Sequence, residues 1–499
     1  MGASSMEQVL SLCRRRGFFF PTAEIYGSIA GFYDYGPLGC ELRRNIREAW
    51  WRDVVQGRAD VVGLDCSIVT HPQVWHASGH AESFSDFFVD CRESKMRYRA
   101  DQLFFGAVRV DGRDLAMLSV LDGPEMAAEA AEKAMAVRKK LALAGPGEPV
   151  QLRPVLEATE EELARIPSPA TGTPGTLTAP RPFHLMLETR VGSVADAATT
   201  TYLRPETAQG IFVNFSNVVD TARQKIPFGI AQVGRSFRNE ITPRNSLFRT
   251  REFEQMELEY FIAPDADWQA IHGRWIRDRL DWYASIGISG DLLGRDVHAK
   301  EKLAHYALAC TDITFRYPFG VQEIEGIAVR GNFDLTQHQK HSGKSLEYFD
   351  GERHYVPCVV EPSAGVDRIF LALLCAAYDE DEMDGEMRTV LRLHPRLAPI
   401  KTAVLPLVKN RPELVVLAEK IAQKLRRHWN IAFDSSGAIG RRYRRMDEVG
   451  TPFAVTVDFQ SLDDGTVTLR ERDSAKQLRI AAEDLVPCLR ERIDGPDRP

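Results

Sequence analysis

The sequence lacks the features of membrane, secreted and disulfide-linked proteins. Its longest strongly apolar run, 369–378, lies between Arg368 and Asp379 and is too short to span a bilayer. The N-terminal residues contain no apolar segment with a cleavage site, so we expect no signal peptide. The eight cysteines stand singly without a C-x-x-C pair, which predicts reduced thiols and no zinc. These absences favour a cytoplasmic protein that does not contact a membrane.

The familiar nucleotide-binding and zinc motifs are absent as well. There is no G-x-G-x-x-G fingerprint, and "HSGKS" fails as a phosphate loop because His338 stands where that pattern needs its first glycine. His76 and His80 are four residues apart, but no third ligand accompanies them, so we expect them in a loop or core. A bound nucleotide would therefore need a fold without these glycine-rich loops.

The composition is that of a multidomain globular protein. A chain of 499 residues predicts two or three domains, and 44% hydrophobic with 27% charged residues is ordinary for such proteins. The net charge of −7 argues against coating of nucleic acid by the whole chain. Residues 401–445, however, carry eleven Lys and Arg against three acids. This segment is either a nucleic-acid-binding surface or a solvated charged face.

Changes of texture along the chain predict its domain boundaries. Within "LRRNIREAWWRDVV", apolar residues recur at helical spacing, at Leu42, Ile46, Ala49, Trp50 and Val54. An Ala/Lys/Glu-rich stretch is followed by the Pro- and Thr-rich "RIPSPATGTPGTLTAPRP", which predicts an insertion ending in a flexible linker. Strands and helices alternate at the C-terminus, as in a small α/β domain. The predicted boundaries are 1–105 and 183–395 for one divided domain, 106–182 for the insertion and 400–499 for the last domain.

The segment "PFGIAQVGRSFRNEITPRNSLFRTREFEQMELEYFI" reads as two strands joined by a polar loop. The period of two puts one set of residues on one face of the second strand: Arg251, Phe253, Gln255, Glu257 and Glu259. Phe253 could stack on a base, with Arg249 or Arg251 near phosphates and Glu257 near a cation. An exposed strand with cross-strand ion pairs is the alternative.

A second cluster lies in "CVVEPSAGVDRIFLALLCAAY". We expect a buried strand to end at Glu361 and a helix to open at Pro362 and Ser363. The apolar stripe of this helix comprises Val366, Ile369, Phe370, Leu373 and Leu374. Arg368 lies among Ala364, Gly365 and Ala372, so a phosphate could approach its guanidinium closely. A solvated surface charge is the alternative for this arginine.

Six strings in order resemble one family. They are "YDYGPLGCELRRNI", "YLRPETAQGIF", "SFRNEITPRNSLFRTREFEQMELEYF", "GNFDLTQH", "EPSAGVDR" and "SGAIGRRYRRMDEVGTPFAVTVDF". Together they resemble the glycyl-tRNA synthetases of the homodimeric class II type, over nearly the whole chain except the insertion. The resemblance implies an α+β catalytic domain, an antiparallel sheet flanked by helices, followed by an α/β anticodon-binding domain. It also implies a homodimer that pairs through the helix after Gly39.

The implied activity is glycine–tRNA ligation. In this family glycine and ATP, with Mg²⁺, give glycyl-adenylate and pyrophosphate, and the glycyl group then passes to the 3′ end of tRNA-Gly. Two alternatives are a non-catalytic paralogue that binds nucleic acid and a class II synthetase for another small amino acid, such as serine, threonine or proline. The presence of all the residues that the resemblance assigns to the reaction disfavours the first alternative. A pocket crowded with carboxylates disfavours the second.

The resemblance also implies the site residues. Arg238 and Arg368 are the catalytic residues, at the α-phosphate and γ-phosphate, and Phe253 stacks on adenine. The implied glycine site comprises Arg99, Glu206, Phe253, Glu254, Gln255, Met256, Glu257, Glu361 and Ser363. The implied ATP site comprises Arg238, Asn239, Glu240, Phe248, Arg249, Thr250, Arg251, Glu252, Phe253, Glu323, Ile324, Gly365 and Arg368.

Charge repulsion adds an expectation about the empty glycine site. Glu206, Glu257 and Glu361 would surround one ammonium, so without it we expect at least one of them to have a raised pKa. The insertion could contact the tRNA acceptor stem or act as a spacer. In the last domain, "GRRYRR" at 440–445 favours nucleic-acid binding over a merely solvated face.

Overall fold

The computed structural model describes residues 3, 5–110, 113–123, 126–141, 148–192, 200–243, 245–304, 306–383 and 385–495. The chain divides into two compact units, which are described separately. The first comprises 1–66, 207–235 and 253–499, and the second comprises 67–206 and 236–252. Within the described ranges, every helix is too short or too polar to cross a membrane.

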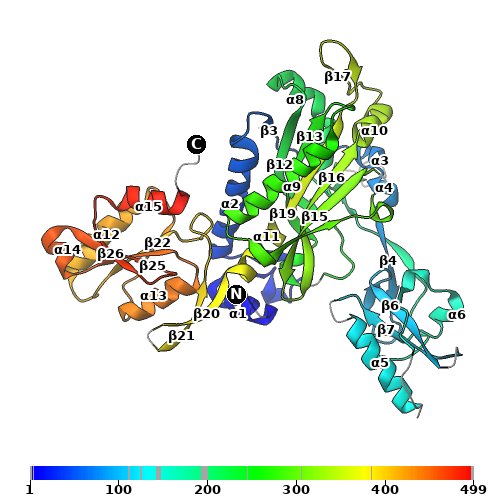
Figure 1. Ribbon diagram of the computed structural model, residues 1–499, viewed down its shortest axis with the longest axis horizontal. Coiled ribbons are helices and arrows are strands. Elements are labelled where there is room, and N and C mark those ends of the chain that lie inside the picture. The colour runs from blue at the N-terminus through cyan, green and yellow to red at the C-terminus, as the bar shows by residue number, and fades with distance from the viewer. Residues whose placement is uncertain are drawn as a thin grey trace. The chain divides into compact units, whose positions relative to one another are not determined.

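A seven-stranded sheet forms the centre of the first unit (Figure 1). Its strands are, in spatial order, β14 (Leu293–Val297), β15 (Ala309–Tyr317), β16 (Gly320–Gly331), β19 (Cys358–Gly365), β13 (Glu252–Ile262), β12 (Phe228–Phe237) and β3 (Val61–Gly63). Strands β14, β15, β16, β19 and β13 are antiparallel to their neighbours in that order, and β3 alone is parallel to β12. The two predicted strands of the hairpin are thus neighbours at the centre of this sheet.

Helices α9 (Trp268–Ser285) and α11 (Val366–Ala377) lie against this sheet (Figure 1). On α9, Trp275 packs edge-on against Tyr260 of β13, and His272 bonds to the carbonyl of Ile327. Tyr260 belongs to the apolar face of β13. These helices therefore cover that face and leave the face of Glu257 to form a site.

Helix α2 (Pro37–Trp51) confirms the predicted amphipathic helix after the turn-rich segment. Proline at its first position suits a helix start, and five predicted apolar residues are buried: Leu42, Ile46, Ala49, Trp50 and Val54. Its backbone continues as a short π-helical turn, Arg52–Gln56. Asn45 on α2 is buried because its amide donates to the carbonyls of Leu397 and Ala398.

The strand before α11 is longer than the sequence predicted. We expected it to end at Glu361, but β19 runs to Gly365 and pairs with β13 and β16 on its two sides. Pro362 and Ser363 therefore lie in a central strand, and the helix begins at Val366. Proline lacks an N–H and is rare there, which is why the sequence suggested a boundary. The apolar stripe predicted for the helix is buried as expected.

The C-terminal part of the first unit has its own sheet and core. The strands, in spatial order, are β23 (Ile431–Phe433), β22 (Thr402–Pro406), β24 (Phe453–Val457), β25 (Thr466–Glu471) and β26 (Gln477–Ala481). The helices are α12 (Pro412–Arg426), α13 (Ile439–Glu448), α14 (Phe459–Asp464) and α15 (Leu485–Asp494). Residues of α12 and α15 pack on β24 and β25 in one apolar cluster. The predicted alternation of strands and helices is confirmed.

Shorter elements complete the first unit. They are α1 (Met6–Arg16), β1 (Phe19–Pro21), β2 (Tyr33–Tyr35), α7 (Ala208–Val213), α8 (Phe215–Ala222), α10 (Phe333–Ser342), β17 (Tyr348–Phe349), β18 (His354–Tyr355), β20 (Tyr378–Met383) and β21 (Glu386–Leu391). Helices α7 and α10 contact each other and contribute Phe212 and Leu335 to one buried cluster with β12 and β13.

The second unit contains two small sheets. One consists of β5 (Arg97–Arg99), β4 (Ser85–Asp90) and β9 (Arg181–His184), and the other of β7 (Arg113–Leu121), β6 (Leu103–Val110) and β8 (Arg153–Pro154). Beside them are α3 (Gln73–Ala77), α4 (His80–Ser83), α5 (Met126–Lys140), α6 (Glu160–Leu163) and the hairpin of β10 (Leu187–Arg190) with β11 (Thr200–Leu203). The predicted insertion, 106–182, lies inside this unit, which extends beyond it on both sides.

The Pro- and Thr-rich stretch of this unit is not a free linker. Ile166 and Leu177 are buried in the cluster that contains Val89 and Phe105. Leu177 also forms a β-bridge with Cys91. The prediction of a flexible linker overlooked these two apolar residues, which fix the stretch to the core although its turn-forming composition is typical of loops.

Candidate active site

Glu257 is a carboxylate held by four donors. Thr207 donates from its backbone N–H at 2.9 Å and from its hydroxyl to Oε2, while Gln255 Nε2 and Ser363 Oγ each donate to Oε1 at 2.7 Å. Glu257 is 2% exposed. Hydrogen bonds to the charged form of a carboxyl favour that form, so Glu257 is suited to remain ionised in a buried place. The structure thus brings together three predicted residues: Gln255, Glu257 and Ser363.

Glu361 is held by an arginine that the sequence did not predict. Arg330 Nη1 donates to Glu361 Oε1 at 2.8 Å, and its Nε and Nη2 reach both oxygens of Asp334 on α10 at 2.9 and 3.0 Å. All three side chains are buried. Arg330 and Asp334 are four residues apart across the end of β16, and this spacing does not predict a contact with Glu361. The cluster can therefore be recognised only from the folded structure.

Glu259 lies on the same face of β13 but has no donor. Its side chain is fully buried, and neither carboxylate oxygen has a hydrogen-bond partner in the described part of the chain. Burial raises the pKa of Glu259 well above its ordinary value, and the nearby carboxylates of Glu361 and Glu257 raise it further. The alternation along β13 placed Glu259 beside Glu257, but the predicted site did not include it. The expected raised pKa of Glu206, Glu257 or Glu361 stays a prediction.

The same sheet face continues onto β15 and β16. In the antiparallel register Asp312 pairs with Gly326, which pairs with Ser363, which in turn pairs with Glu257. A Cβ placed on Gly326 would lie 3.6 Å from Asp312 Oδ1 and 3.8 Å from Glu323 Oε1. Two carboxylates therefore flank a position on the sheet that has no side chain.

Asp312 also has neighbours that could ligate a metal. His298 Nε2 lies 2.8 Å from Asp312 Oδ2, and the Cys310 thiol donates to Oδ1 at 3.6 Å. These three side chains form the one group of possible metal ligands found among the described residues. Burial and the charge of Glu323 raise the pKa of Asp312, and burial raises that of Cys310 to about 12. The expectation of no zinc stays a prediction.

Arg368 lies at the start of α11, against Gly365. Its Nη1 donates to the carbonyl of Glu323 at 3.1 Å and pairs with the Glu323 carboxylate at 3.1 Å. A Cβ on Gly365 would lie 3.7 to 3.8 Å from the stem of Arg368. The side chain of Arg368 is 27% exposed and that of Glu323 is 46% exposed. An anionic group could therefore reach this guanidinium from solvent.

Two predicted glycine-site residues face the other way. Glu254 lies 3.1 Å from both Arg43 and Arg47 of α2, and its backbone N–H donates to Asp367. Met256 is fully buried on the same face as Glu254. Because side chains alternate along a strand, neither can share the face of Glu257. The side chains of Glu254 and Met256 therefore lie on the opposite face, and their assignment to the glycine site stays a prediction.

The remaining predicted residues of the first unit differ in exposure. Ile324 is buried, and Phe253 is half-buried at the start of β13. The alternative reading of β13 as an exposed strand is wrong, because every residue from Glu254 to Ile262 is buried.

The other half of the predicted site belongs to the second unit. Glu206 is 9% exposed, and its Oε2 lies 3.4 Å from His80 Nε2. His80 was expected in a loop or core, and its contact with Glu206 was not predicted. Arg238 Nε donates to the Pro205 carbonyl at 3.0 Å, and its guanidinium lies 5.5 Å from the ring centre of Phe84. Glu206 and Arg238 are thus anchored close together on one local framework.

Backbone contacts order the loop after Arg238. The N–H of Arg238 donates to the Arg251 carbonyl, and the Arg251 guanidinium donates twice to the Glu240 carbonyl. The Asn239 N–H donates to Leu185, and Arg249 lies 3.9 Å from the Glu240 carboxylate. Within this loop Phe248 and Thr250 are buried, and Glu252 is half-buried. Arg238, Arg249 and Arg251 therefore contact other described residues of the predicted ATP-binding loop.

Arg99 is already engaged by two carboxylates. It pairs with Asp86 at 2.5 Å and with Asp101 at 2.8 Å. The side-chain hydrogen bonds to Asp101 and the charges of Asp86 and Asp101 outweigh burial and raise the pKa of Arg99. Its assignment to the glycine site stays a prediction, and in the structure Arg99 fastens β5 to β4.

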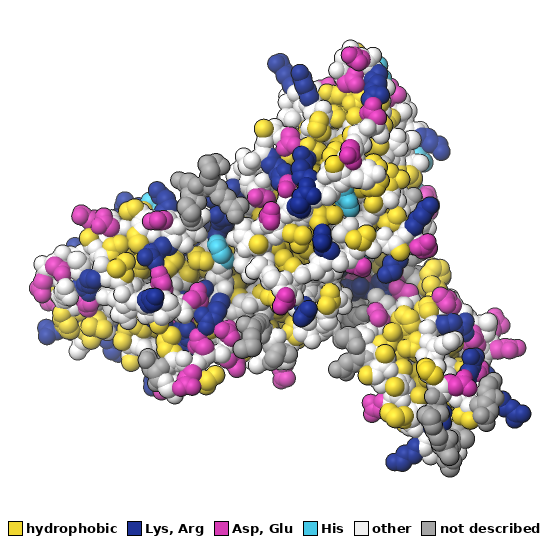
Figure 2. All heavy atoms as spheres, in the orientation of Figure 1, with side chains coloured by type: hydrophobic (Ala, Val, Ile, Leu, Met, Phe, Trp, Pro, Cys, Tyr) yellow, Lys and Arg dark blue, Asp and Glu magenta, His cyan; other side chains and the backbone are white. Residues whose placement is uncertain are grey.

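The arginines of "GRRYRR" have mainly structural contacts. Arg442 is 1% exposed and donates to the carbonyls of Pro406 and Leu407. Arg444 pairs with Glu386, and Arg445 pairs with Asp434. Figure 2 shows basic and acidic side chains mixed over the visible face of this part. The string alone is therefore weaker support for nucleic-acid binding than its charge suggested.

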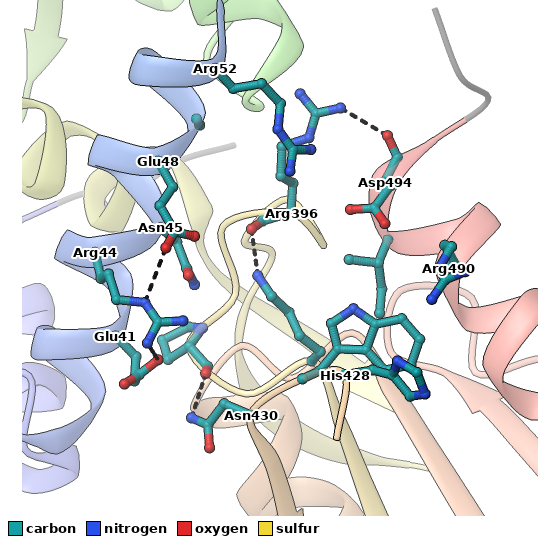
Figure 3. Close-up of a pocket in the computed structure, with 15 residues that line it drawn as sticks. Glu41, Arg44, Asn45, Glu48, Arg52, Arg396, His428, Asn430, Arg490 and Asp494 are labelled. Atoms are coloured by element: carbon teal, nitrogen blue, oxygen red, sulfur yellow. Dashed lines mark hydrogen bonds and ion pairs between the residues drawn. The ribbon is translucent and has the colours of Figure 1, made fainter. Parts of the chain in front are cut away.

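A separate cavity of about 310 Å³ lies beside α2, away from these predicted residues (Figure 3). Its charged and aromatic lining comprises Glu41, Arg44, Glu48, Arg52, Arg396, Lys401, His428, Trp429, Arg490 and Asp494. Figure 3 shows Arg44 between Glu41 and Glu48, at 3.8 and 3.4 Å. Burial lowers the pKa of Lys401 to about 7. No predicted site residue lines this cavity.

Comparison with known proteins finds two family models that match this chain. Residues 193–433 match the tRNA synthetase class II core domain (G, H, P, S and T), and 401–492 match an anticodon binding domain. A glycine–tRNA ligase of Rhodopirellula baltica is 46% identical over 541 residues, covering 98% of this chain and 99% of that protein. A glycine–tRNA ligase of Thermus thermophilus is 46% identical over 527 residues, covering 99% of this chain and all of that protein. One of Thermobifida fusca is 46% identical over 503 residues, covering 99% of each chain.

Proposed function

The chain belongs to the glycine–tRNA ligase family, and from this premise we propose that it activates glycine with ATP and transfers the glycyl group to tRNA-Gly. In the first step a glycine carboxylate oxygen attacks the α-phosphorus of ATP, and pyrophosphate leaves. In the second step the terminal adenosine of the tRNA displaces AMP. The class II core and the anticodon-binding domain supply the two binding functions that this sequence of steps needs.

The arrangement around Glu257 supports the proposed substrate most directly. Glycine offers only an ammonium and a carboxylate, so its site must recognise charge and exclude larger side chains. Ser363, on the neighbouring strand β19, donates a hydrogen bond to Glu257, and Arg330 donates one to Glu361. We assign the glycine ammonium to these two carboxylates, with Glu206 as the third.

Arginines would stabilise the phosphates during the first step. The proposed role of Arg238 is to bind the α-phosphate, where negative charge is spread over oxygens in the transition state. Its Nε donates to the Pro205 carbonyl, which anchors the side chain beside Glu206. Arg368 is proposed to hold the γ-phosphate, and the half-buried Phe253 to stack on adenine. No side-chain nucleophile is required.

The carboxylates flanking Gly326 fit Mg²⁺. Asp312 and Glu323 offer hard oxygen donors beside a position without a side chain, which suits a small cation that keeps several waters. We propose that these two residues hold the Mg²⁺ that accompanies ATP. The ion would neutralise phosphate charge when bound, and Arg368 beside Glu323 would act on the same group.

We further propose a homodimer and a cytoplasmic location. The family resemblance assigns subunit pairing to the helix after Gly39, and α2 carries the charged residues Glu41, Arg44 and Glu48 outside its buried stripe. Measurement of the molar mass in solution tests the dimer, and substitutions on this polar face of α2 should weaken it.

Pyrophosphate exchange tests the proposed activity. The purified protein with Mg²⁺ and ATP is given glycine, alanine, serine, threonine or proline separately. Exchange with glycine alone is the expected result. Exchange with serine, threonine or proline instead would indicate a synthetase for another small amino acid. A folded protein that binds ATP but supports no exchange would indicate a non-catalytic paralogue.

A further inference from the structure

Among the described residues, Glu259 is a carboxyl on the glycine-site face whose two oxygens both lack a hydrogen-bond donor. Glu257 accepts four hydrogen bonds and Glu361 accepts one from Arg330, whereas both oxygens of Glu259 are buried without a partner among the described residues. An ionised carboxylate in such a place would be very unfavourable, because burial removes water and nothing replaces it. Glu259 is therefore neutral in the empty site.

The register of β13 places Glu259 inside the site rather than at its margin. Glu257 pairs with Ser363, and Tyr260 pairs with Val360, so the antiparallel register puts Glu259 across from Glu361. Glu257 and Glu259 share a face because they are two residues apart. A charge that arrives between Glu257 and Glu361 thus arrives next to Glu259.

The charged groups around Glu259 come from four elements. Glu257 is on β13, Glu361 on β19, Arg330 on β16 and Asp334 on α10. Arg330 is the cation of this group, and its hydrogen bonds go to Glu361 and Asp334. With burial, the three other carboxylates raise the pKa of Glu259, and Arg330 opposes them. An added ammonium would act in the same direction as Arg330 and favour ionisation.

We propose that Glu259 holds a proton while the glycine site is empty and releases it to solvent when the glycine ammonium binds. This proposal rests on the function proposed above. One carboxyl O–H bond breaks, the carboxylate stays in the protein, and the proton passes to buffer. One positive charge enters as one leaves, so the net charge of the buried cluster is the same in both states. Glu259 is a positioning residue, because it acts through the charge of the pocket.

Calorimetry with two adenylate analogues tests the proposal. The probes are 5′-O-(glycylsulfamoyl)adenosine, which carries the ammonium, and 5′-O-sulfamoyladenosine, which lacks the glycyl group. Binding enthalpies in buffers with different ionisation enthalpies give the number of protons exchanged. Measurements near pH 6.5 keep the analogue's amine protonated, since an α-amino group ionises near about 7.7 to 8.0. Glycyl-analogue binding by the full-length protein should release more protons per chain than binding of the other analogue.

The variant Glu259→Gln separates charge from shape. Its amide keeps the size of the carboxyl but cannot release a proton, so the extra proton release should disappear while the glycyl analogue still binds. In the wild-type protein, glycine affinity should rise with pH wherever the empty site still holds the Glu259 proton, and this slope should be flat in the variant. Glu347→Gln, on an exposed loop, should behave like the wild type.

Three results would overturn the inference. Equal proton counts for the two analogues with the wild-type protein would exclude release at the ammonium site, whatever the variant does. Unchanged release in Glu259→Gln would assign the proton to another group. If the glycyl analogue bound no more tightly than the analogue without glycine, the glycine site itself would be wrong and the proposed function would fail with it.

Discussion

Replacement of Glu257 by glutamine should weaken glycine use without disturbing ATP use. Glutamine preserves the shape of the side chain but removes the charge that would face the ammonium. A hydrogen bond to a charged group contributes about 1.5 to 3 kcal/mol, which corresponds to a fall in kcat/KM for glycine of about 10- to 150-fold. The donors Thr207 and Ser363 would also meet an amide group, one side of which cannot accept from them.

The assay is pyrophosphate exchange with glycine varied at saturating ATP, then with ATP varied at saturating glycine. Glu254→Gln is the matched control, because it lies three residues earlier on the same strand but on the opposite face. Its carboxylate contacts Arg43 and Arg47, so the control should lower stability and leave the KM for glycine unchanged. Equal loss of glycine use in both variants, or none in Glu257→Gln, would refute the assignment of faces and the ammonium site.

Three further predictions concern the surrounding charges. Arg330→Met should lower the free energy of unfolding by about 3 to 5 kcal/mol, because two buried carboxylates lose their cation, whereas Arg353→Met at an exposed pair should change it little in denaturant titrations. Burial lowers the pKa of Lys401 to about 7 from an ordinary 10.5, so between these pH values the folded state binds fewer protons than the unfolded state and gains stability as pH rises. Lys401→Met removes this titration. The difference in the free energy of unfolding between the variant and the wild type should therefore shift in favour of the wild type by about 1.4 kcal/mol per pH unit above pH 7. Gly326→Ala should raise the Mg²⁺ concentration needed for half-maximal exchange, and an unchanged requirement would place the ion elsewhere.

The spacing of apolar residues in the sequence predicted those elements in which one face of a helix or strand is buried. The stripe on α2 is confirmed by its burial, and the two faces of β13 are confirmed by the different contacts of Glu254 and Glu257. The same alternation places the side chains of Glu254 and Met256, which the predicted glycine site includes, on the face opposite Glu257. Their inclusion came from the family strings, which give a segment of residues without saying which side of the strand each occupies.

Partners from distant segments could not be predicted from spacing. Arg330 is 31 residues from Glu361, and Thr207 is 50 residues from Glu257, so only the folded sheet brings them together. The extension of β19 through Pro362 was missed for a related reason, since the local preference of proline gives way to pairing with strands on both sides. Local propensity decides such residues only where tertiary contacts do not.

The charge states of the site illustrate how far residue type alone can go. In the sequence, Glu257, Glu259 and Glu361 are chemically identical side chains. Within the described part of the chain they differ in donors: Glu257 accepts from Thr207, Gln255 and Ser363, Glu361 accepts from a guanidinium, and Glu259 accepts from none. Because desolvation is common to all three, the donors decide which carboxyl keeps its proton. A site that must be stable both when it is empty and when a cation is bound can therefore use one carboxyl without hydrogen-bond donors, which gains or loses a proton as the cation leaves or binds.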